Sequence, residues 1–317
     1  MEIFDLHIDL SSFCLTSGRG SIENKNRLGD FFLPDQVDIP RLKKGKVKIL
    51  LANICPILAT PQGFELPENS INETMRQINF YKTLKGINLI DNLNSRLKGI
   101  SALLSIEGAY FIEQKKDLAL LIELRKLGVV SISPTWNIDN ALGTGAGNQN
   151  SKTGLTRLGQ EFIEMCEDTG IIIDAVHSSR ATFKDIASFS KKPFFVSHTA
   201  SYTVNNHRRN LKDTEIRRVA NSGGIIGLSF IKDFIGGNSI NLVTKHLKHL
   251  LNVAGEDHVA IGSDFDGMGQ GDLIRGIEDI GMMQGLFEFF KMSGINNRIL
   301  EKVACKNAQK FFRDSLK

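Results

Sequence analysis

The chain has 317 residues, of which 41% are hydrophobic and 23% are charged, and its formal net charge is +4. This composition is typical of a globular protein with enough apolar side chains to build a core. Because the charge is low and, outside residues 41–48, the basic residues are spread along the chain, a nucleic-acid-binding protein is not favoured.

The cysteines and the first residues indicate in which cellular compartment the protein is expected. Cys14, Cys55, Cys166 and Cys305 lie far apart and form no CxxC pair, which is typical of free thiols in a reducing compartment. The first residues lack a basic segment followed by a long apolar run, so we expect no signal peptide. No apolar stretch approaches the roughly 20 residues that span a bilayer. We therefore predict a cytoplasmic protein.

Short apolar segments recur along the chain, and segments with helical spacing separate them. The predicted strands are residues 3–10, 47–56, 102–108, 129–136, 171–177, 194–200, 224–230 and 258–265. The clearest predicted helices are residues 117–128, 240–255 and 155–170, the last of which ends in Gly as a helix C-cap does. Eight strand–helix units in roughly 250 residues predict a (β/α)8 TIM barrel.

We expect residues 1–317 to form one barrel domain. No linker rich in Pro, Gly or Ser and no shift in composition marks a boundary between two domains. Two helices, predicted at 276–292 and 296–315, follow the last strand and close the barrel. A doubly wound sheet is the competing architecture, but no GxGxxG turn follows a first strand, so the barrel is favoured.

Six ionisable residues lie at the ends of otherwise apolar predicted strands. They are His7 and Asp9 on the first strand, Glu107 on the third, His177 on the fifth, His198 on the sixth and Asp264 on the eighth. The catalytic groups of a barrel lie at the carboxyl ends of its strands. We therefore expect all six side chains on the same rim.

Imidazole and carboxylate groups are the ligands of zinc and similar divalent ions. His7 and Asp9 are two residues apart on a strand, so their side chains share a face and, with Glu107, could hold one ion. His177 and His198, with the second oxygen of Glu107, could hold another. Two such ions would share a hydroxide that forms near neutral pH and can attack a carbonyl.

Each of these residues also has an ordinary structural explanation. A buried His near a strand end is more often a hydrogen-bonded core residue than a metal ligand. Glu107 could be an ion-pair partner, and Asp264 could cap a helix or shape a turn. That all six residues lie on one rim by chance is much less expected than a structural role for any one of them, so the set favours a metal site.

Several segments resemble the membrane (renal) dipeptidase family of the amidohydrolase superfamily, in its cytoplasmic bacterial form. These segments are HID (7–9), QVDIPRLKKGKV (36–47), IEG (106–108), GLTRLGQEFIEMCEDTGIIIDAVH (154–177), SHTASYTVNNHRRNL (197–211) and GEDHVAIGSDFDG (255–267). The resemblance runs nearly from end to end, and the last two segments are long and specific. It implies a binuclear zinc dipeptidase with a (β/α)8 fold.

The resemblance also implies roles for the metal-ligand candidates. His7 and Asp9 match the family's ligands of the first metal, Glu107 its bridging carboxylate, and His177 and His198 its ligands of the second metal. Many related amidohydrolases bridge their metals with a carbamylated lysine at the end of the fourth strand. Here that strand ends in SPTWN, which contains no lysine, so Glu107 is the expected bridge.

Three further residues match positions at which the family binds or cleaves its substrate. Asp264 matches the Asp that takes a proton from the nucleophilic water and passes it to the leaving amine. Arg209 matches the arginine that holds the C-terminal carboxylate of the substrate, a task that suits a planar guanidinium. Trp136 stands where vertebrate members have a histidine that contacts the scissile carbonyl. Its N–H can donate one hydrogen bond, so it is either a substrate contact or an aromatic wall of the pocket.

The expected function is hydrolysis of small unblocked dipeptides, including those with a C-terminal D-residue, by a hydroxide that bridges two Zn²⁺ ions; manganese or cobalt could replace zinc. An N-acyl-D-amino-acid deacylase, or another amidohydrolase on the same metal site, is the enzymatic alternative. A non-catalytic metal-binding protein is the alternative from another class. The resemblance suggests a homodimer, and we expect neither nucleic acid nor a membrane as a partner.

Overall fold

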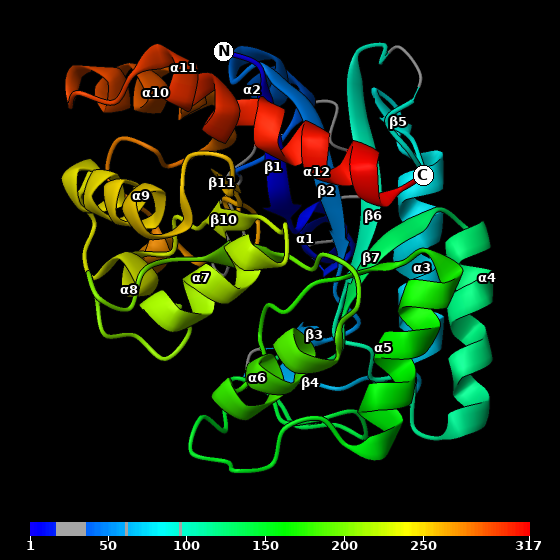
Figure 1. Ribbon diagram of the computed structural model, residues 1–317. Helices are drawn as coiled ribbons and strands as arrows, with labels where there is room; N and C mark the ends of the chain where they lie inside the picture. Colours follow the sequence, from blue (N-terminus) through cyan, green and yellow to red (C-terminus); the bar gives the residue numbers. More distant parts are fainter. Residues whose placement is uncertain (17–35, 61–62, 95–96) are drawn as a thin grey trace.

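The structure is a computed structural model that describes residues 1–16, 36–60, 63–94 and 97–317 (Figure 1). Within these residues, eight parallel strands are hydrogen-bonded in the order β8-β7-β6-β2-β1-β11-β10-β9. They are β1 (Ile3–Ile8), β2 (Val47–Ile54), β6 (Ile100–Glu107), β7 (Val129–Ser133), β8 (Ile172–Ile173), β9 (Val196–Thr199), β10 (Ile226–Leu228) and β11 (Val259–Ile261). Each of them overlaps one predicted strand.

The two ends of this strand order meet. Asp174, directly after β8, forms a parallel bridge with Phe195, directly before β9, and backbone hydrogen bonds join the two segments. The sheet therefore closes on itself, and the predicted (β/α)8 barrel is confirmed. The strands are almost wholly buried, as expected where side chains fill a barrel on one side and helices cover it on the other.

Helices connect the strands and cover the outside of the barrel (Figure 1). They are α1 (Leu10–Thr16), α2 (Ile39–Lys44), α3 (Ser70–Thr83), α4 (Leu120–Lys126), α5 (Arg157–Thr169), α6 (Arg180–Phe189), α7 (Asp213–Asn221), α8 (Lys232–Ile235), α9 (Ile240–Ala254), α10 (Met283–Met292), α11 (Asn297–Glu301) and α12 (Asn307–Ser315). In α5 the Thr156 side chain accepts a hydrogen bond from the backbone of Gly159, and Gly170 ends the helix at φ +76°.

Three short strands were not predicted. β3 (Leu58–Thr60) and β4 (Gly63–Glu65) form an antiparallel hairpin after β2, and β5 (Ile87–Leu89) pairs with β6. The hairpin lies above the carboxyl end of β2, where the loops of a barrel surround its active site.

The last part of the chain closes the amino-terminal end of the barrel. The Phe312 ring of α12 packs against Phe4 and Phe195, with centroid distances of 5.5 and 5.4 Å, and both partners lie where their strands begin. The first closing helix begins later than predicted, with a 3-10 turn at Ile280–Met282 ahead of α10, because Asp279 caps that turn. The carboxyl ends of the strands thus remain for a site. In the described part of the chain, no helix has the length and apolar character that crossing a membrane requires.

Candidate metal centre

The carboxyl ends of the strands bring six ionisable side chains to one place. His7 lies in β1 and Asp9 just beyond it, Glu107 ends β6, His177 follows β8, His198 lies in β9 and Asp264 follows β11. All six are buried, with at most 7% of each residue exposed. Among the described residues, three overlapping groups have the geometry to hold a metal ion: His7–Asp9–Glu107, Glu107–His177–His198 and His7–His198–Asp264.

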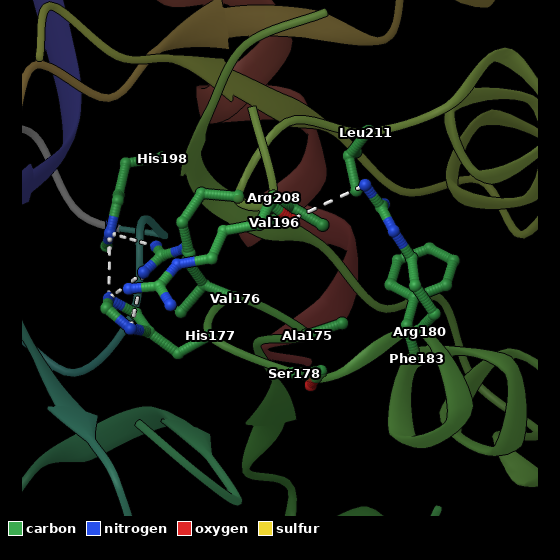
Figure 2. A pocket seen from close by; sticks show the side chains of 11 residues that line it. Ala175, Val176, His177, Ser178, Arg180, Phe183, Val196, His198, Arg208 and Leu211 are labelled. Atoms are coloured by element: carbon green, nitrogen blue, oxygen red, sulfur yellow. Dashed lines mark hydrogen bonds between the residues drawn. The ribbon is translucent and has the colours of Figure 1, made fainter. Parts of the chain in front are cut away.

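Glu107 belongs to two of these groups. Its Oε1 atom lies 3.7 Å from His7 Nε2, 2.8 Å from His177 Nε2 and 3.6 Å from His198 Nε2. Figure 2 shows His177 and His198 facing each other at one side of a pocket, with their Nε2 atoms 3.2 Å apart. On the other side, Asp9 Oδ2 is 3.3 Å from His7 Nε2. One carboxylate therefore faces imidazoles on both sides of the centre.

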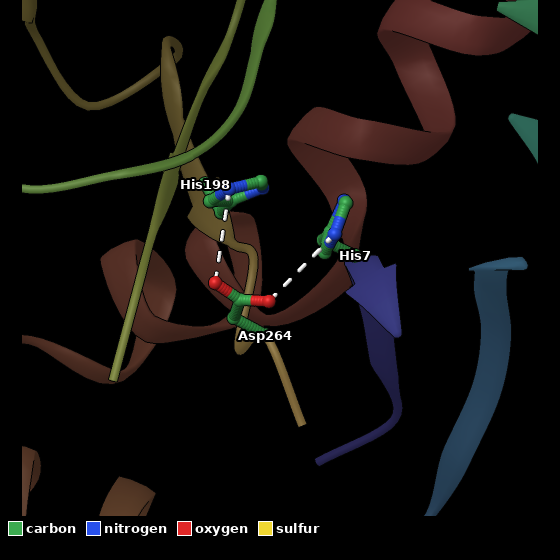
Figure 3. Close-up of side chains that lie close together, drawn as sticks. All are labelled: His7, His198 and Asp264. Atoms are coloured by element: carbon green, nitrogen blue, oxygen red, sulfur yellow. Dashed lines mark ion pairs between the residues drawn. The ribbon is translucent and has the colours of Figure 1, made fainter. Parts of the chain in front are cut away.

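Asp264 lies between the two sides of the centre. Its Oδ1 and Oδ2 atoms are 3.7 Å from His7 Nε2 and from His198 Nε2, respectively (Figure 3). The backbone of Asp264 has φ +69° and that of His177 has φ +56°. Residues other than glycine rarely adopt this left-handed conformation, and it persists where the surrounding structure holds it, often at functional sites. Here the Asp264 N–H donates to the His7 carbonyl oxygen, which fixes the turn.

Two buried aspartates hold the strand ends that carry these residues. Asp5 Oδ1 accepts hydrogen bonds from the N–H groups of His7 and Ser263, and Ser263 directly precedes Asp264. Asp174 Oδ1 accepts from Val176 and Ser197 in the same way; these two residues precede His177 and His198. The contacts of Asp5 are thus those of a structural residue of the strand.

Burial and neighbouring charges shift the pKa values of the three imidazoles. Burial is the main cause that lowers the pKa of His177 to about 3, and the positive charge of Arg209 is the second cause. Burial and the neighbouring His7 also lower the pKa of His198. Burial disfavours protonation of His7 as well, but Glu107 and Asp9 outweigh it and raise the pKa of His7 to about 10. Two neutral imidazoles thus stand on one side of the centre and a carboxylate-paired one on the other.

The donor set fits a divalent metal ion. Within the described residues, Glu107 Oε1 is buried and makes no hydrogen bond, although imidazole nitrogens surround it. A buried carboxylate oxygen normally has a hydrogen-bond partner, and a metal ion is one of the explanations when it does not. Imidazole nitrogen and carboxylate oxygen are the ligands that zinc and related ions take.

Arg209 contacts the same imidazoles. Its Nη1 atom is 2.8 Å from His177 Nε2, and its Nη2 atom is 2.9 Å from His198 Nε2. The guanidinium carbon lies 5.2 Å from the centre of the Phe234 ring. Burial lowers the pKa of Arg209 to about 10, so the group stays protonated at neutral pH. Because one nitrogen lone pair cannot accept a hydrogen bond and bind an ion at once, ion binding requires the guanidinium to move away.

Trp136 lines the centre beside His177. The two rings are stacked, with centroids 5.3 Å apart and an angle of 21° between their planes. Trp136 packs against an apolar cluster formed by Cys55, Ile57 and Tyr110, and its backbone N–H donates to the Tyr110 hydroxyl at 3.2 Å. This position makes the indole part of the wall around the candidate ligands.

Two asparagines at the centre were missed in the sequence. Asn53 Nδ2 donates to Asp9 Oδ1 at 2.6 Å and to Glu107 Oε2 at 3.0 Å. Asn137 Oδ1 lies 2.9 Å from His177 Nδ1. The available signals were weak: Asn53 is the one strongly polar side chain in the run 49–56, and Asn137 follows the end of a predicted strand.

A closed parallel barrel with buried imidazoles and carboxylates at the carboxyl ends of its strands is the arrangement of a metal-dependent hydrolase. The family model "Membrane dipeptidase (Peptidase family M19)" matches residues 1–316, and the chain belongs to this family. Its resemblance to the membrane dipeptidases is thereby confirmed, and the chain is a metal-dependent dipeptidase.

Individual relatives agree with this assignment. An uncharacterised dipeptidase of Schizosaccharomyces pombe is 29% identical over 306 residues, which are 88% of this chain and 72% of that protein. A second uncharacterised dipeptidase of the same yeast is 27% identical, over 97% of this chain and 82% of its own length. A metallopeptidase of Rhodobacter sphaeroides, solved with a phosphinate mimic of L-Ala-D-Ala, has the same fold: the TM-score is 0.86 at 24% identity, with 99% of each chain covered.

Proposed function

We propose that this dipeptidase uses two zinc ions and cleaves small unblocked dipeptides, including those whose C-terminal residue has the D configuration. The observation that carries the proposal is the position of Glu107, whose one carboxylate faces His7 on one side and His177 and His198 on the other. The dipeptide mimic bound by the Rhodobacter sphaeroides metallopeptidase, which ends in D-Ala, supports the choice of substrate.

The ligands divide into two sets that share Glu107. His7, Asp9 and Glu107 would hold one ion, and Glu107, His177 and His198 would hold the other. The chemistry that two bound ions supply is a hydroxide available near neutral pH for attack on the peptide carbonyl.

Asp264 is the proposed proton carrier. Its buried carboxylate lies between His7 and His198 and so faces both ligand sets. In this role it accepts a proton from the attacking water and gives it to the amine nitrogen as the C–N bond breaks, so that both products leave with the correct number of protons. Trp136, against His177, shields the reacting bond from bulk water.

Arg209 is the proposed anchor for the C-terminal carboxylate. When His177 and His198 use their Nε2 atoms as ligands, the guanidinium that now contacts those atoms becomes available for another acceptor. Its planar fork can meet both oxygens of a carboxylate. In a dipeptide a single residue separates the scissile bond from the C-terminal carboxylate, so an anchor for that carboxylate beside the metal centre would favour dipeptides over longer peptides.

Metal removal and two substitutions test the catalytic assignment. The purified protein should contain about two zinc ions, hydrolyse a panel of dipeptides, and lose this activity in a chelator until zinc is restored.

Asp264→Asn should keep the zinc and lower kcat by roughly 10²- to 10⁴-fold. His177→Ala should lose zinc as well as activity. Asp257→Asn, at an exposed aspartate, is the matched control for the first variant. Full activity in Asp264→Asn or His177→Ala would refute the assigned site.

Removal of the guanidinium tests the carboxylate anchor. The wild-type enzyme should cleave a free dipeptide far better than the same dipeptide with an amidated C-terminus. In Arg209→Met this preference should disappear, because activity on the free dipeptide falls while the weak activity on the amide is kept. Arg208→Met is the control, since Arg208 is the exposed neighbour of the buried Arg209. An undiminished preference in Arg209→Met would exclude the anchor and favour an amidohydrolase that recognises another part of its substrate.

A further inference from the structure

Asn53 lies between two carboxylates of the proposed metal centre. The register of the sheet explains its position: Asn53 pairs with Ser105, two residues before Glu107, and Ala52 pairs with Ile8, one residue before Asp9. Side chains two apart on a strand share a face, so Asn53 and Glu107 both point into the barrel. The amide is 1% exposed, and its Nδ2 atom donates to Asp9 Oδ1 at 2.6 Å and to Glu107 Oε2 at 3.0 Å.

We propose that Asn53 is a positioning residue that sets which oxygen of each carboxylate faces the ions. The inference rests on the two-ion site proposed above. With Asp9 Oδ1 and Glu107 Oε2 held by the amide, Asp9 Oδ2 and Glu107 Oε1 are directed toward His7 Nε2, at 3.3 and 3.7 Å. One side chain thereby orients a ligand of the first ion and the carboxylate shared by both.

The chemistry of the amide group defines its orientation. An ionised carboxylate only accepts hydrogen bonds, so the NH₂ side of Asn53 and not its carbonyl oxygen must face Asp9 and Glu107. An amide also donates without bringing a charge. A lysine or arginine at this point would neutralise the carboxylates and compete with the cations, whereas asparagine leaves their negative charge available.

The backbone of Asn53 is held independently of any ion. Its carbonyl oxygen accepts hydrogen bonds from Ser11 Oγ at 2.8 Å and from the Tyr81 hydroxyl at 2.9 Å. Two residues later, Gln77 of α3 bonds both the N–H and the carbonyl of Cys55, at 3.0 and 2.6 Å. The carboxyl end of β2 is thus fixed by α1 and α3, and the amide is already in place before an ion arrives. Such outer contacts orient ligands and raise their affinity for metal.

The test measures zinc affinity and needs no substrate. Asn53→Leu keeps the approximate size of the side chain and removes both donors, so the zinc dissociation constant should rise roughly 10- to 100-fold, measured by competition with a coloured chelator. Asn307→Leu is the matched control. Asn307 is also buried, and its Nδ2 atom donates to the carbonyls of Glu256 and Val259, both at 2.8 Å and away from the ligands. This control should be less stable than the wild type and bind zinc with unchanged affinity.

The outcomes separate a positioning role from a structural one. If Asn53→Leu unfolds at lower denaturant concentration, as the control does, but binds zinc as tightly as the wild type, the inference is wrong. If Asn53→Leu does not fold, Asn53→Ser takes its place, since its hydroxyl fits the space but cannot reach both carboxylates; the same loss of zinc affinity is expected. Dipeptidase activity can be absent for other reasons, so a failure of the proposed substrate leaves this measurement unaffected.

Discussion

At the scale of single residues, Asp5 in β1 and Asp174 directly after β8 have equivalent contacts, and these two strands lie opposite each other in the barrel. Each carboxylate accepts a hydrogen bond from the N–H of the residue two positions later in the chain, which is His7 for Asp5 and Val176 for Asp174. Each also accepts one from the N–H of a serine: Ser263, which precedes Asp264, or Ser197, which precedes His198. Among the residues that the structure describes, neither aspartate belongs to a group that could hold an ion. Their contacts instead fix the backbone from which His7, His177 and His198 project.

One of these aspartates makes stability depend on pH. Burial raises the pKa of Asp174 to about 6, whereas an unfolded aspartate titrates near 4. The folded protein therefore binds the proton more tightly, and the free energy of unfolding contributed by this group decreases as pH rises from about 4 to about 6. In Asp174→Asn the amide oxygen can still accept from Val176 and Ser197, but the group no longer titrates.

Unfolding in urea checks this expectation on metal-free protein. The free energy of unfolding of Asp174→Asn, minus that of the wild type, should be larger at pH 7 than at pH 4 by up to about 3 kcal/mol, since one pKa unit corresponds to about 1.4 kcal/mol. Any constant cost of burying the new amide cancels in this comparison. A difference that is the same at both pH values would contradict the prediction.

The residues that sequence reasoning found and missed differ in chemistry. His7, Glu107 and Asp264 stood out because an ionisable group at the end of an apolar strand is unusual and the barrel gives it a place. Asn53 carries no charge, and its contact with Glu107 depends on the register between β2 and β6, which the sequence does not state. The same limit applies to Asn137, whose partner His177 is 40 residues away.

At the scale of elements, the strands were predicted better than the ends of the helices. Alternating or continuous apolar runs mark a barrel strand directly, whereas helix ends depend on local caps such as the Asp279 side chain ahead of α10. The hairpin of β3 and β4 was not predicted, because three-residue strands are too short to leave a periodic pattern.

The closing helix α12 allows stability to be separated from the metal centre. Phe312 is fully buried against Phe4 and Phe195 at the amino-terminal end of the strands. Phe312→Ala should lower the free energy of unfolding by about 3–5 kcal/mol, as expected for a large cavity in a core. Zinc affinity of the folded variant should not change, because the ligands lie at the other end of the barrel.

Chemical denaturation and chelator competition on the same samples measure both quantities. Met292→Ala, at a side chain whose residue is 84% exposed on α10, is the control and should stay within about 0.5 kcal/mol of the wild type. A loss of zinc affinity in Phe312→Ala would mean that the two ends of the barrel are coupled.

At the scale of the whole molecule, the recurrence of eight strand–helix units was sufficient to predict the barrel, because few other architectures use that many in a chain of this length. What the sequence could not supply is how the barrel closes. Backbone hydrogen bonds around Asp174 and Phe195 join the two ends of the strand order, and backbone groups are the same in every sequence. The Asp174 side chain adds a contact with the Ser197 N–H, but the sequence does not state that these two residues meet.

The pairing of β1 with β11 determines when the centre can form during synthesis of the chain. The hydrogen bond from Ser263 to Asp5 joins residues 258 positions apart, and the turn of Asp264 depends on the His7 carbonyl. During synthesis the first two candidate ligands therefore emerge long before the segment that encloses them, and they cannot be seated until residues 259–264 have left the ribosome. Contacts this distant in sequence are slow to form. Until then β1 has an unpaired edge, and His7 and Asp9 have no enclosed site in which to retain an ion.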